Sequence, residues 1–415
     1  MDSMGQKPTV VLLGTLDTKG IEYGYICERL QQEHGVETIL VDIGVLGEPV
    51  IQPDVMREAV AAAAGYQVDR LIASGDRGAA MKAMAEGAAA IVKELYEQNR
   101  LQAILGLGGS GGTAVVSQAM RQLPVGVPKL IVSTMASGDT RAYVGAVDIT
   151  MMYSVVDVAG INQISARILS NAAAAIAGMA KTDVPDMSAS KPLIGATMFG
   201  VTTPAVETAR KHLEELDYEI LVFHATGTGG QSMETLIRDG FITGSFDLTT
   251  TELADDLVGG VLTAGPTRLN AAGEVGIPQV VSLGALDMVN FGPRDTVPER
   301  FADRRLYEHN ATVTLMRTTA EECAELGRRI AFKLNQATGP VSLFIPLRGV
   351  SVLSKEGQFF HDQAADEALI EALRQDVNPH IVEILELDTD INDPAFARAM
   401  AQRFHEQYQE WLNNR

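Results

Sequence analysis

The sequence predicts an α/β protein made of two Rossmann-like domains in tandem, each a doubly wound parallel sheet. Short apolar runs alternate with longer helix-like segments along the whole chain, which is typical of βαβ units. The polar segment TDVPDMSASKP, residues 182–192, interrupts this alternation and contains two prolines. The length of 415 residues also exceeds the size at which a single core stops growing. We therefore expect domains at residues 1–185 and 186–415.

In the first half, apolar runs predict strands and longer segments predict helices. The expected strands cover residues 9–14, 36–42, 69–75, 101–108, 128–134 and 149–154. The expected helices cover residues 21–34 and 78–97, a segment after the glycines at 106–113, and the alanine-rich residues 161–181.

The second half repeats this plan. Strands are expected at residues 192–200, 218–227, 277–285, 311–318, 341–349 and 380–388. Helices are expected at residues 204–216, from about 230, at 249–260 and at 394–413.

Composition narrows the class of protein and its location. A formal net charge of −20 disfavours nucleic acid and anionic membranes as partners. Cys27 and Cys323 are too few and too far apart for a disulfide framework or a metal site, and they fit buried thiols in a reducing cytosol. There is no signal-peptide pattern and no run of roughly 18 apolar residues. We therefore expect a soluble, cytoplasmic protein.

The stretch GLGGSGGT, residues 106–113, lies between an expected strand and an expected helix. Exposed backbone N–H groups at a helix N-terminus suit an anion. The pattern G-x-G-x-x-G also admits NAD or FAD, but the next strand ends without the expected carboxylate. Glycines that serve only tight turns are a further alternative. The sequence contains no G-x-x-x-x-G-K-[ST] motif of P-loop ATPases.

Other expected strand ends carry small, hydroxylic or cationic residues. In an open parallel sheet, ligands bind beyond the carboxyl ends of the strands. These ends offer Thr15, Asp17, Thr18, Lys19, Ser74, Arg77, Ser133, Thr134 and Ser137. Lys19 and Arg77 can neutralise phosphate oxygens, and Arg77 can do so with two hydrogen bonds. Each could also be a solvated surface charge, but their joint placement favours a nucleotide phosphate pocket that includes Ser133.

Four motifs together carry a family resemblance: GTLDTKG, GLGGSGGT, STMASGDT and SVVDVAGIN. They are similar to those of a bacterial protein family that resembles the ATP-binding N-terminal domain of the plant tobamovirus-resistance protein. The resemblance extends over nearly the whole chain. It implies two Rossmann-like subdomains, bound ATP with magnesium, and a dimer. The resemblance does not imply any particular reaction.

The resemblance also implies which residues contact ATP. They are Asp17, Thr18, Lys19, Arg77 and the segment Gly109, Ser110, Gly111, Gly112. A family hydroxyl after the second strand corresponds to the region of Val45, which cannot donate a hydrogen bond. Metal ligands stay unidentified.

The second half also offers candidate catalytic residues after expected strands. They are His224, Glu252, Asp287 and Arg348. His224 could act as a general base, or it could be a packed or capping histidine. TTTE, residues 249–252, also fits a helix capping box. The segments AILGLGGSGG and ILVFHATGTGG resemble each other, by duplication or by chance.

These observations leave several functions open. One is an ATP-dependent enzyme that acts on a small metabolite in a cleft between the halves. Another is an ATP-binding sensor or interaction protein without chemistry, and an NAD-dependent oxidoreductase is the least favoured. A homodimer is expected mainly from the resemblance, with the alanine-rich helix as a candidate close-packing surface.

Overall fold

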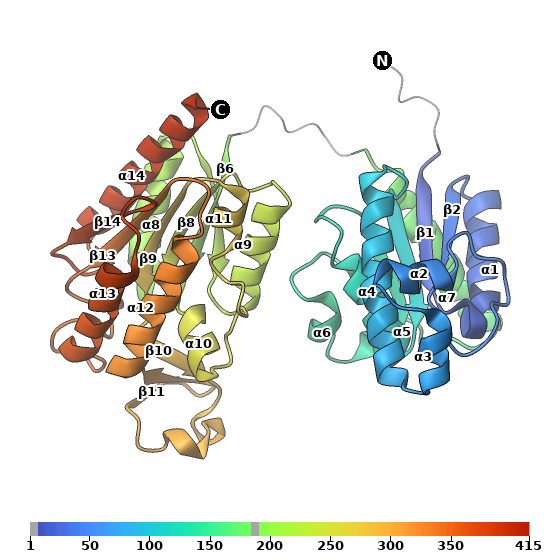
Figure 1. Ribbon diagram of the computed structural model, residues 1–415, viewed down its shortest axis with the longest axis horizontal. Helices are drawn as coiled ribbons and strands as arrows, with labels where there is room; N and C mark the ends of the chain where they lie inside the picture. The colour runs from blue at the N-terminus through green and yellow to red at the C-terminus, as the bar shows by residue number, and fades with distance from the viewer. Residues whose placement is uncertain (1–6, 184–190, 415) are drawn as a thin grey trace. The chain divides into compact units, whose positions relative to one another are not determined.

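The computed structural model describes residues 7–183 and 191–414. The chain divides into two compact units, Met1–Asp186 and Met187–Arg415 (Figure 1). The boundary predicted between residues 185 and 186 lies outside the described residues, as does most of the polar segment 182–192. Each unit is described by itself.

The first domain contains a five-stranded parallel sheet in the order β2-β1-β3-β4-β5. Its strands are β1 (Thr9–Gly14), β2 (Glu37–Asp42), β3 (Ala103–Gly108), β4 (Lys129–Ser133) and β5 (Thr150–Tyr153). The central strand β3 is buried along its whole length, as expected for a parallel sheet that is covered on both faces.

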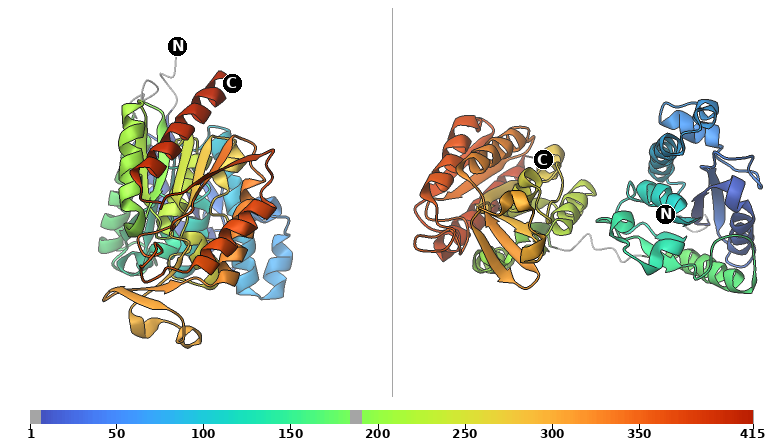
Figure 2. Two further views of the ribbon diagram at one scale, coloured as in Figure 1. Left: turned by 90° about the vertical axis from the view of Figure 1, so that its left-hand side faces the viewer. Right: turned by 90° about the horizontal axis from the view of Figure 1, so that it is seen from below.

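Helices cover both faces of this sheet (Figure 2). Side chains alternate along β1, so that Val10 and Leu12 pack toward one helical layer and Val11 and Leu13 toward the other. The first layer contains α1 (Leu16–Gln32) and α7 (Gln163–Ala180). The other contains α2 (Arg57–Ala63), α3 (Val68–Ser74), α4 (Arg77–Glu97) and α5 (Ser110–Met120). A short helix, α6, spans Arg141–Val144.

The strand predicted at residues 69–75 is wrong, because this segment forms α3. Only Val68 and Leu71 of α3 are buried, and their spacing of three residues matches one helical face. Gly75 then ends the helix with a φ of 64°, a left-handed conformation that favours glycine. Ser74 and Arg77 therefore do not follow a strand, and Arg77 is the first residue of α4.

The second domain contains a six-stranded parallel sheet in the order β14-β13-β9-β8-β6-β7. Its strands are β6 (Leu193–Met198), β7 (Glu219–His224), β8 (Gly244–Thr249), β9 (Gln279–Gly284), β13 (Val341–Pro346) and β14 (Val382–Leu387). Strand β8 was not predicted as a strand, because three of its six residues, Ser245, Asp247 and Thr249, are polar yet buried.

A separate antiparallel sheet projects from one end of this domain (Figures 1 and 2). It consists of β10 (Met288–Phe291), β11 (Leu306–Asn310) and β12 (Val313–Arg317) in the order β10-β12-β11. The strand predicted at residues 311–318 is therefore present, but it does not belong to the parallel sheet.

Two main helical layers enclose the six-stranded sheet. One layer contains α8 (Thr203–Glu215) and α14 (Pro394–Asn413). The other contains α10 (Glu252–Val258), α12 (Ala320–Leu334) and α13 (Gln363–Asp376). Helices α9 (Thr228–Arg238) and α11 (Ala271–Val275) pack together in a smaller cluster. The predicted fold class, two Rossmann-like α/β domains, is confirmed.

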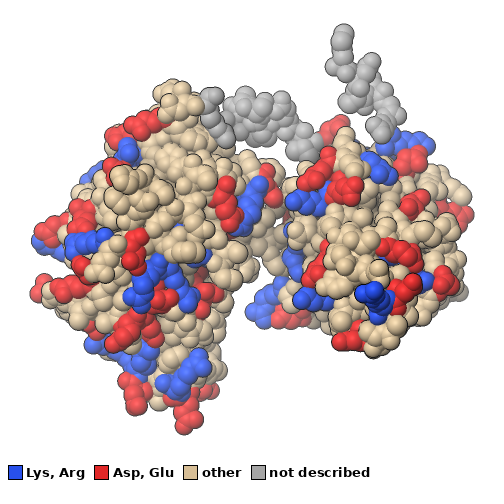
Figure 3. All heavy atoms as spheres, viewed as in Figure 1, with Lys and Arg blue, Asp and Glu red and all other residues tan. Residues whose placement is uncertain are grey.

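The surface charges and the lengths of the helices relate to two partners that the sequence disfavours, nucleic acid and membranes. Basic and acidic side chains are interspersed over the visible face of each domain (Figure 3). Among the described residues, no helix combines the length and the hydrophobicity that crossing a bilayer requires.

Candidate functional site

A cavity of about 270 Å³ lies in the first domain at the carboxyl ends of β1, β2 and β3. Strand β1 lies between the other two, and the chain continues from β1 to β2 on one side and returns to β3 on the other. Ligands of open α/β sheets bind at this topological switch point. The volume is near the lower end of the usual range for ligand sites.

The N-terminal turns of three helices converge on this cavity. Thr15, Asp17, Thr18 and Lys19 come from the start of α1, Arg77 from the start of α4, and Gly109 to Gly112 from the start of α5. Each helix N-terminus carries a partial positive charge and N–H groups without a partner inside the helix. Their convergence makes this cavity suited to an anion.

The glycines of the 106–113 stretch differ in how closely neighbouring atoms pack against them. A Cβ on Gly106 would lie 2.3 Å from Val116, and a Cβ on Gly108 would lie 2.8 Å from the backbone nitrogen of Thr113, so these two allow close packing of β3 against α5. Gly109 would meet only Thr134 Oγ1, at 3.7 Å. Packing therefore does not require a glycine at 109.

Two cations line the same cavity. Lys19 is half-buried, and its Nζ donates a hydrogen bond to the carbonyl oxygen of Val158 at 2.5 Å. Arg77 is exposed, and its Nη2 lies 3.7 Å from the position that a Cβ on Gly111 would occupy. Arg77 therefore lies beside the N-terminal turn of α5, and Lys19 lines the same cavity as that turn.

Two carboxylates hold the loops around the cavity. Asp17 Oδ2 accepts hydrogen bonds from the backbone N–H groups of Leu46 (2.8 Å) and Gly47 (3.1 Å). Asp42 Oδ1 accepts from Leu16 N (3.0 Å) and Gly44 N (2.9 Å). Burial raises the pKa of Asp42, and the nearby charge of Asp17 adds to this rise. Asp17 Oδ1 and Asp42 Oδ2 are buried, with no hydrogen-bond partner among the described residues.

The remaining wall of the cavity is apolar, and only Val45 of it was placed near the site from the sequence, through the family resemblance. It consists of Ile43, Val45, Leu46, Met81, Met84 and Val115. Arg77, Met81 and Met84 are spaced four and three residues apart, so they share one face of α4. This spacing, in an otherwise alanine-rich helix, was the available signal for the two methionines.

Ser133 does not line this cavity. It is fully buried, it shares a hydrogen bond with Thr113 Oγ1 at 2.7 Å, and its Oγ accepts from Met135 N at 2.9 Å. Its hydroxyl therefore ties β4 to α5 and to the turn that follows β4. We do not retain it as a ligand contact.

The candidate catalytic residues of the second domain lie at or beyond the ends of different strands. His224 is the exposed last residue of β7. Arg348, two residues after β13, is also exposed and pairs with Asp388 at 2.5 Å. Four strand intervals separate β7 from β13 in the sheet order. At about 4.8 Å per interval, these two residues are roughly 19 Å apart along the sheet edge, too far to share one small substrate group.

Glu252 is buried and does not form the predicted capping box, since it is the first residue of α10, while Thr249 belongs to β8 and shares a hydrogen bond with Thr202 Oγ1 at 2.7 Å. Its Oε1 instead accepts from Gly227 N (2.7 Å) and Gly230 N (3.1 Å) at the start of α9. Its Oε2 pairs with Arg268 Nε at 2.6 Å. The glycine-rich turn before α9 is thus filled by a carboxylate of the same chain, whereas the corresponding turn before α5 faces a cavity.

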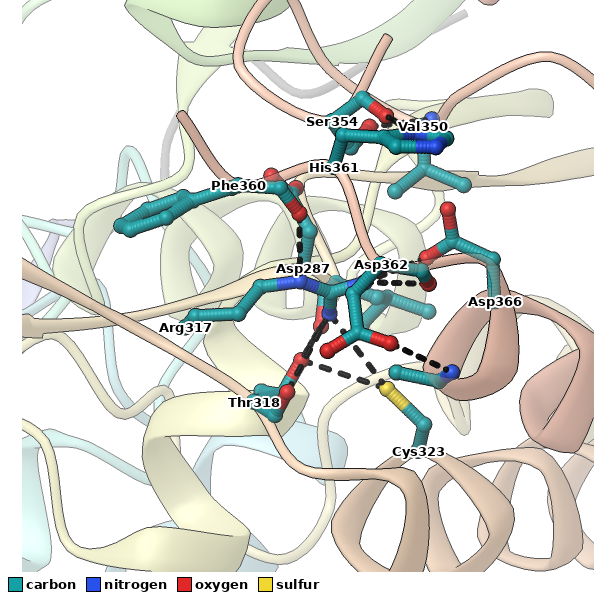
Figure 4. Close-up of polar contacts among 12 residues, drawn as sticks. Asp287, Arg317, Thr318, Cys323, Val350, Ser354, Phe360, His361, Asp362 and Asp366 are labelled. Atoms are coloured by element: carbon teal, nitrogen blue, oxygen red, sulfur yellow. Dashed lines mark hydrogen bonds and ion pairs between the residues drawn. The ribbon is translucent and has the colours of Figure 1, made fainter. Parts of the chain in front are cut away.

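Asp287 belongs to a buried polar cluster (Figure 4). Its Oδ2 accepts from Ser351 Oγ at 2.7 Å, and Arg317 is a nearby positive charge. Burial raises the pKa of Asp287 to about 6, and the charge of Arg317 opposes that rise. Because Asp287 is 1% exposed, its carboxyl group lies inside the fold and not at a surface that a substrate reaches.

Comparison with known families adds to this geometry. Residues 8–185 match the model of the uncharacterised protein family UPF0261 N-terminal domain, and residues 191–408 match the C-terminal domain of the same family. The chain belongs to the UPF0261 family. The predicted resemblance is confirmed, since the relatives of this chain include the plant protein described next.

A UPF0261 protein of Clostridium tetani is 55% identical over 95% of this chain and 97% of its own length. One from Rhizobium meliloti is 47% identical over 94% of this chain and 96% of its own. The ToMV resistance protein Tm-1 of Solanum lycopersicum is 44% identical over 80% of this chain, which corresponds to 45% of that longer protein.

Some solved structures show a distant similarity. A UDP-N-acetylglucosamine 2-epimerase from Rickettsia bellii matches 99% of this chain and 98% of its own, at 10% identity and a TM-score of 0.23. A similarity of this size supports no statement about activity.

Proposed function

We propose that the first domain binds ATP as its magnesium complex in the cavity at the ends of β1, β2 and β3. One observation carries this proposal: three helix N-termini and two cations, Lys19 and Arg77, meet at the same cavity. Such an arrangement offers backbone N–H donors and positive charge to a polyphosphate. The family resemblance to an ATP-binding plant domain supports the choice of nucleotide.

The residues have distinct parts in this proposal. The N–H groups of Ser110, Gly111 and Gly112 face the phosphates, and Arg77 pairs with phosphate oxygens from the start of α4. Lys19 uses one donor on Val158. A lysine ammonium has three donors, so two remain for the phosphates without loss of that bond.

The residues present also fit magnesium. A carboxylate in a phosphate pocket repels the ligand unless a cation lies between them. Asp17 lines the cavity, and its Oδ1 is a buried oxygen without a hydrogen-bond partner among the described residues. Magnesium is usually held by one or two carboxylates together with phosphates and water. Asp17 Oδ1 would hold the ion, which would neutralise phosphate charge there.

Of the two forms that this function can take, binding without chemistry has the stronger support. The residues expected to act on a second substrate do not converge: His224 and Arg348 are far apart along the sheet edge, while Glu252 and Asp287 are buried in internal networks. An ATP-dependent reaction stays a prediction, and in it His224→Ala would keep ATP affinity but lose turnover by at least about 10²-fold.

Calorimetry tests the proposal, with ATP and magnesium titrated into the whole chain. We expect saturable binding of one ATP per chain, and no measurable binding would contradict it. A parallel assay for ADP release, with and without a metabolite mixture, separates the enzyme from the binding protein. The homodimer also stays a proposal, and a monomer mass by light scattering at micromolar concentration would end it.

A further inference from the structure

Polar and apolar groups are segregated within the ATP cavity, and this bears on which nucleotides it accepts. Its polar side chains all belong to the N-terminal turns of the three helices: Thr15, Asp17, Thr18, Lys19, Arg77 and Ser110. The rest of the wall carries only aliphatic and thioether side chains, from Ile43, Val45, Leu46, Met81, Met84 and Val115. None of these six side chains donates a conventional hydrogen bond.

Most backbone N–H groups beside this apolar wall are also occupied. Between residues 43 and 47, the N–H of Ile43 donates to Gly14 O at 3.0 Å and that of Gly44 to Asp42 Oδ1 at 2.9 Å. The N–H groups of Leu46 and Gly47 both donate to Asp17 Oδ2. Four backbone donors that could otherwise contact a base edge are therefore used within the fold.

We infer that this cavity recognises the triphosphate and not the base, so that its ligand class is nucleoside triphosphates in general. The inference rests on the proposed ATP site. Bases are told apart by the donors and acceptors on their edges, whereas every base has the same kind of flat face. Methionine and aliphatic side chains pack against such a face whichever base carries it. The cavity then selects its ligand by the number of phosphates, which contact the charged side chains of Lys19 and Arg77.

The chemistry sets the expected selectivity. A site that hydrogen-bonds its substrate rejects an analogue without the matching group by about 10⁴–10⁵-fold, whereas an apolar pocket discriminates far more weakly. We therefore expect dissociation constants for ATP, GTP, CTP and UTP within about tenfold of one another. Removing phosphates from the nucleotide should raise the dissociation constant more, because each phosphate that is removed takes its charge-assisted hydrogen bonds with it. ADP should bind at least about tenfold more weakly than ATP, and AMP more weakly still.

The test is a matrix of titrations with magnesium at constant ionic strength. The four nucleoside triphosphates, ADP and inorganic tripolyphosphate are titrated into the parent chain, Arg77→Ala and Met81→Leu. We expect Arg77→Ala to weaken all four triphosphates by the same factor, since it removes a phosphate contact. Met81→Leu keeps the wall apolar, so the four should stay within about tenfold of one another.

The results separate two claims, that the cavity binds nucleotides and that it does not select the base. If one triphosphate binds more than tenfold tighter than the other three, the inference is overturned while the nucleotide site stands. If tripolyphosphate binds and none of the nucleotides does, the cavity holds an anion without a base, and both claims fall. If nothing binds, the proposed function fails as well.

Discussion

Replacing Arg77 by alanine is the sharpest perturbation of the proposed site. Arg77 is exposed at the start of α4, and its Nη2 lies 3.7 Å from the position of a Cβ on Gly111. A hydrogen bond to a charged group contributes about 1.5–3 kcal/mol. Because Arg77 is open to water, we expect the lower part of this range, about 1.5–2 kcal/mol, which corresponds to a roughly 10- to 30-fold rise in the dissociation constant.

The chain offers a matched control in Lys82→Ala. Lys82 lies five residues further along α4, is exposed, and pairs with Glu86 at 3.9 Å on the surface. Both variants lose one positive charge, and surface substitutions of this kind change stability by only about 0.5 kcal/mol. Calorimetry with ATP and magnesium should therefore show weakening in Arg77→Ala alone. Parent-like affinity in Arg77→Ala, or equal weakening in both variants, would refute the placement of the phosphates.

Three further predictions concern other parts of the chain. Gly111→Val should abolish ATP binding, measured by calorimetry, because its side chain would project into the cavity beside Met81 and Arg77, where the phosphates approach the start of α5; parent-like affinity would exclude a close approach to α5. Glu252→Ala should lower the free energy of unfolding in urea by about 3 kcal/mol, since it removes a partner of buried Arg268, while ATP affinity stays unchanged; a loss of affinity in the folded variant would contradict our placement of the site. Burial raises the pKa of Asp255 to about 7, so the folded state retains a proton that the unfolded state releases. Stability from this group is full below the unfolded pKa of about 3.9 and is lost as the pH rises to about 7, by about 2–3 kcal/mol between pH 5 and pH 8. Asp255→Asn should remove most of this dependence in urea unfolding, and an unchanged profile would count against it.

The sequence predicted the elements whose signals are local. Helix α14 begins and ends where expected, at Pro394 and Asn413, because a proline at its first turn and a long amphipathic pattern define it. The residues around the cavity were found in a similar way. Asp17, Lys19 and the glycines follow strands, and the carboxyl ends of parallel strands lie at one edge. Arg77 lines the cavity as the first residue of α4, although the strand expected before it is absent.

The failures have non-local causes. In β8, Asp247 is buried because Arg268, 21 residues later, pairs with it at 2.5 Å, and no local pattern reveals that partner. Glu252 has the spacing of a capping box, yet Gly227 and Arg268 decide its contacts. Segment 69–75 is too short for its few apolar residues to separate a strand from a helix.

The most direct test of the account is a crystal structure of the whole chain with ATP and magnesium. The account predicts phosphate oxygens within hydrogen-bond distance of the N–H groups of Ser110 to Gly112, with Arg77 paired to a phosphate and the base against Met81 and Met84. A nucleotide bound elsewhere on the chain, with the start of α5 free of phosphate, would contradict it.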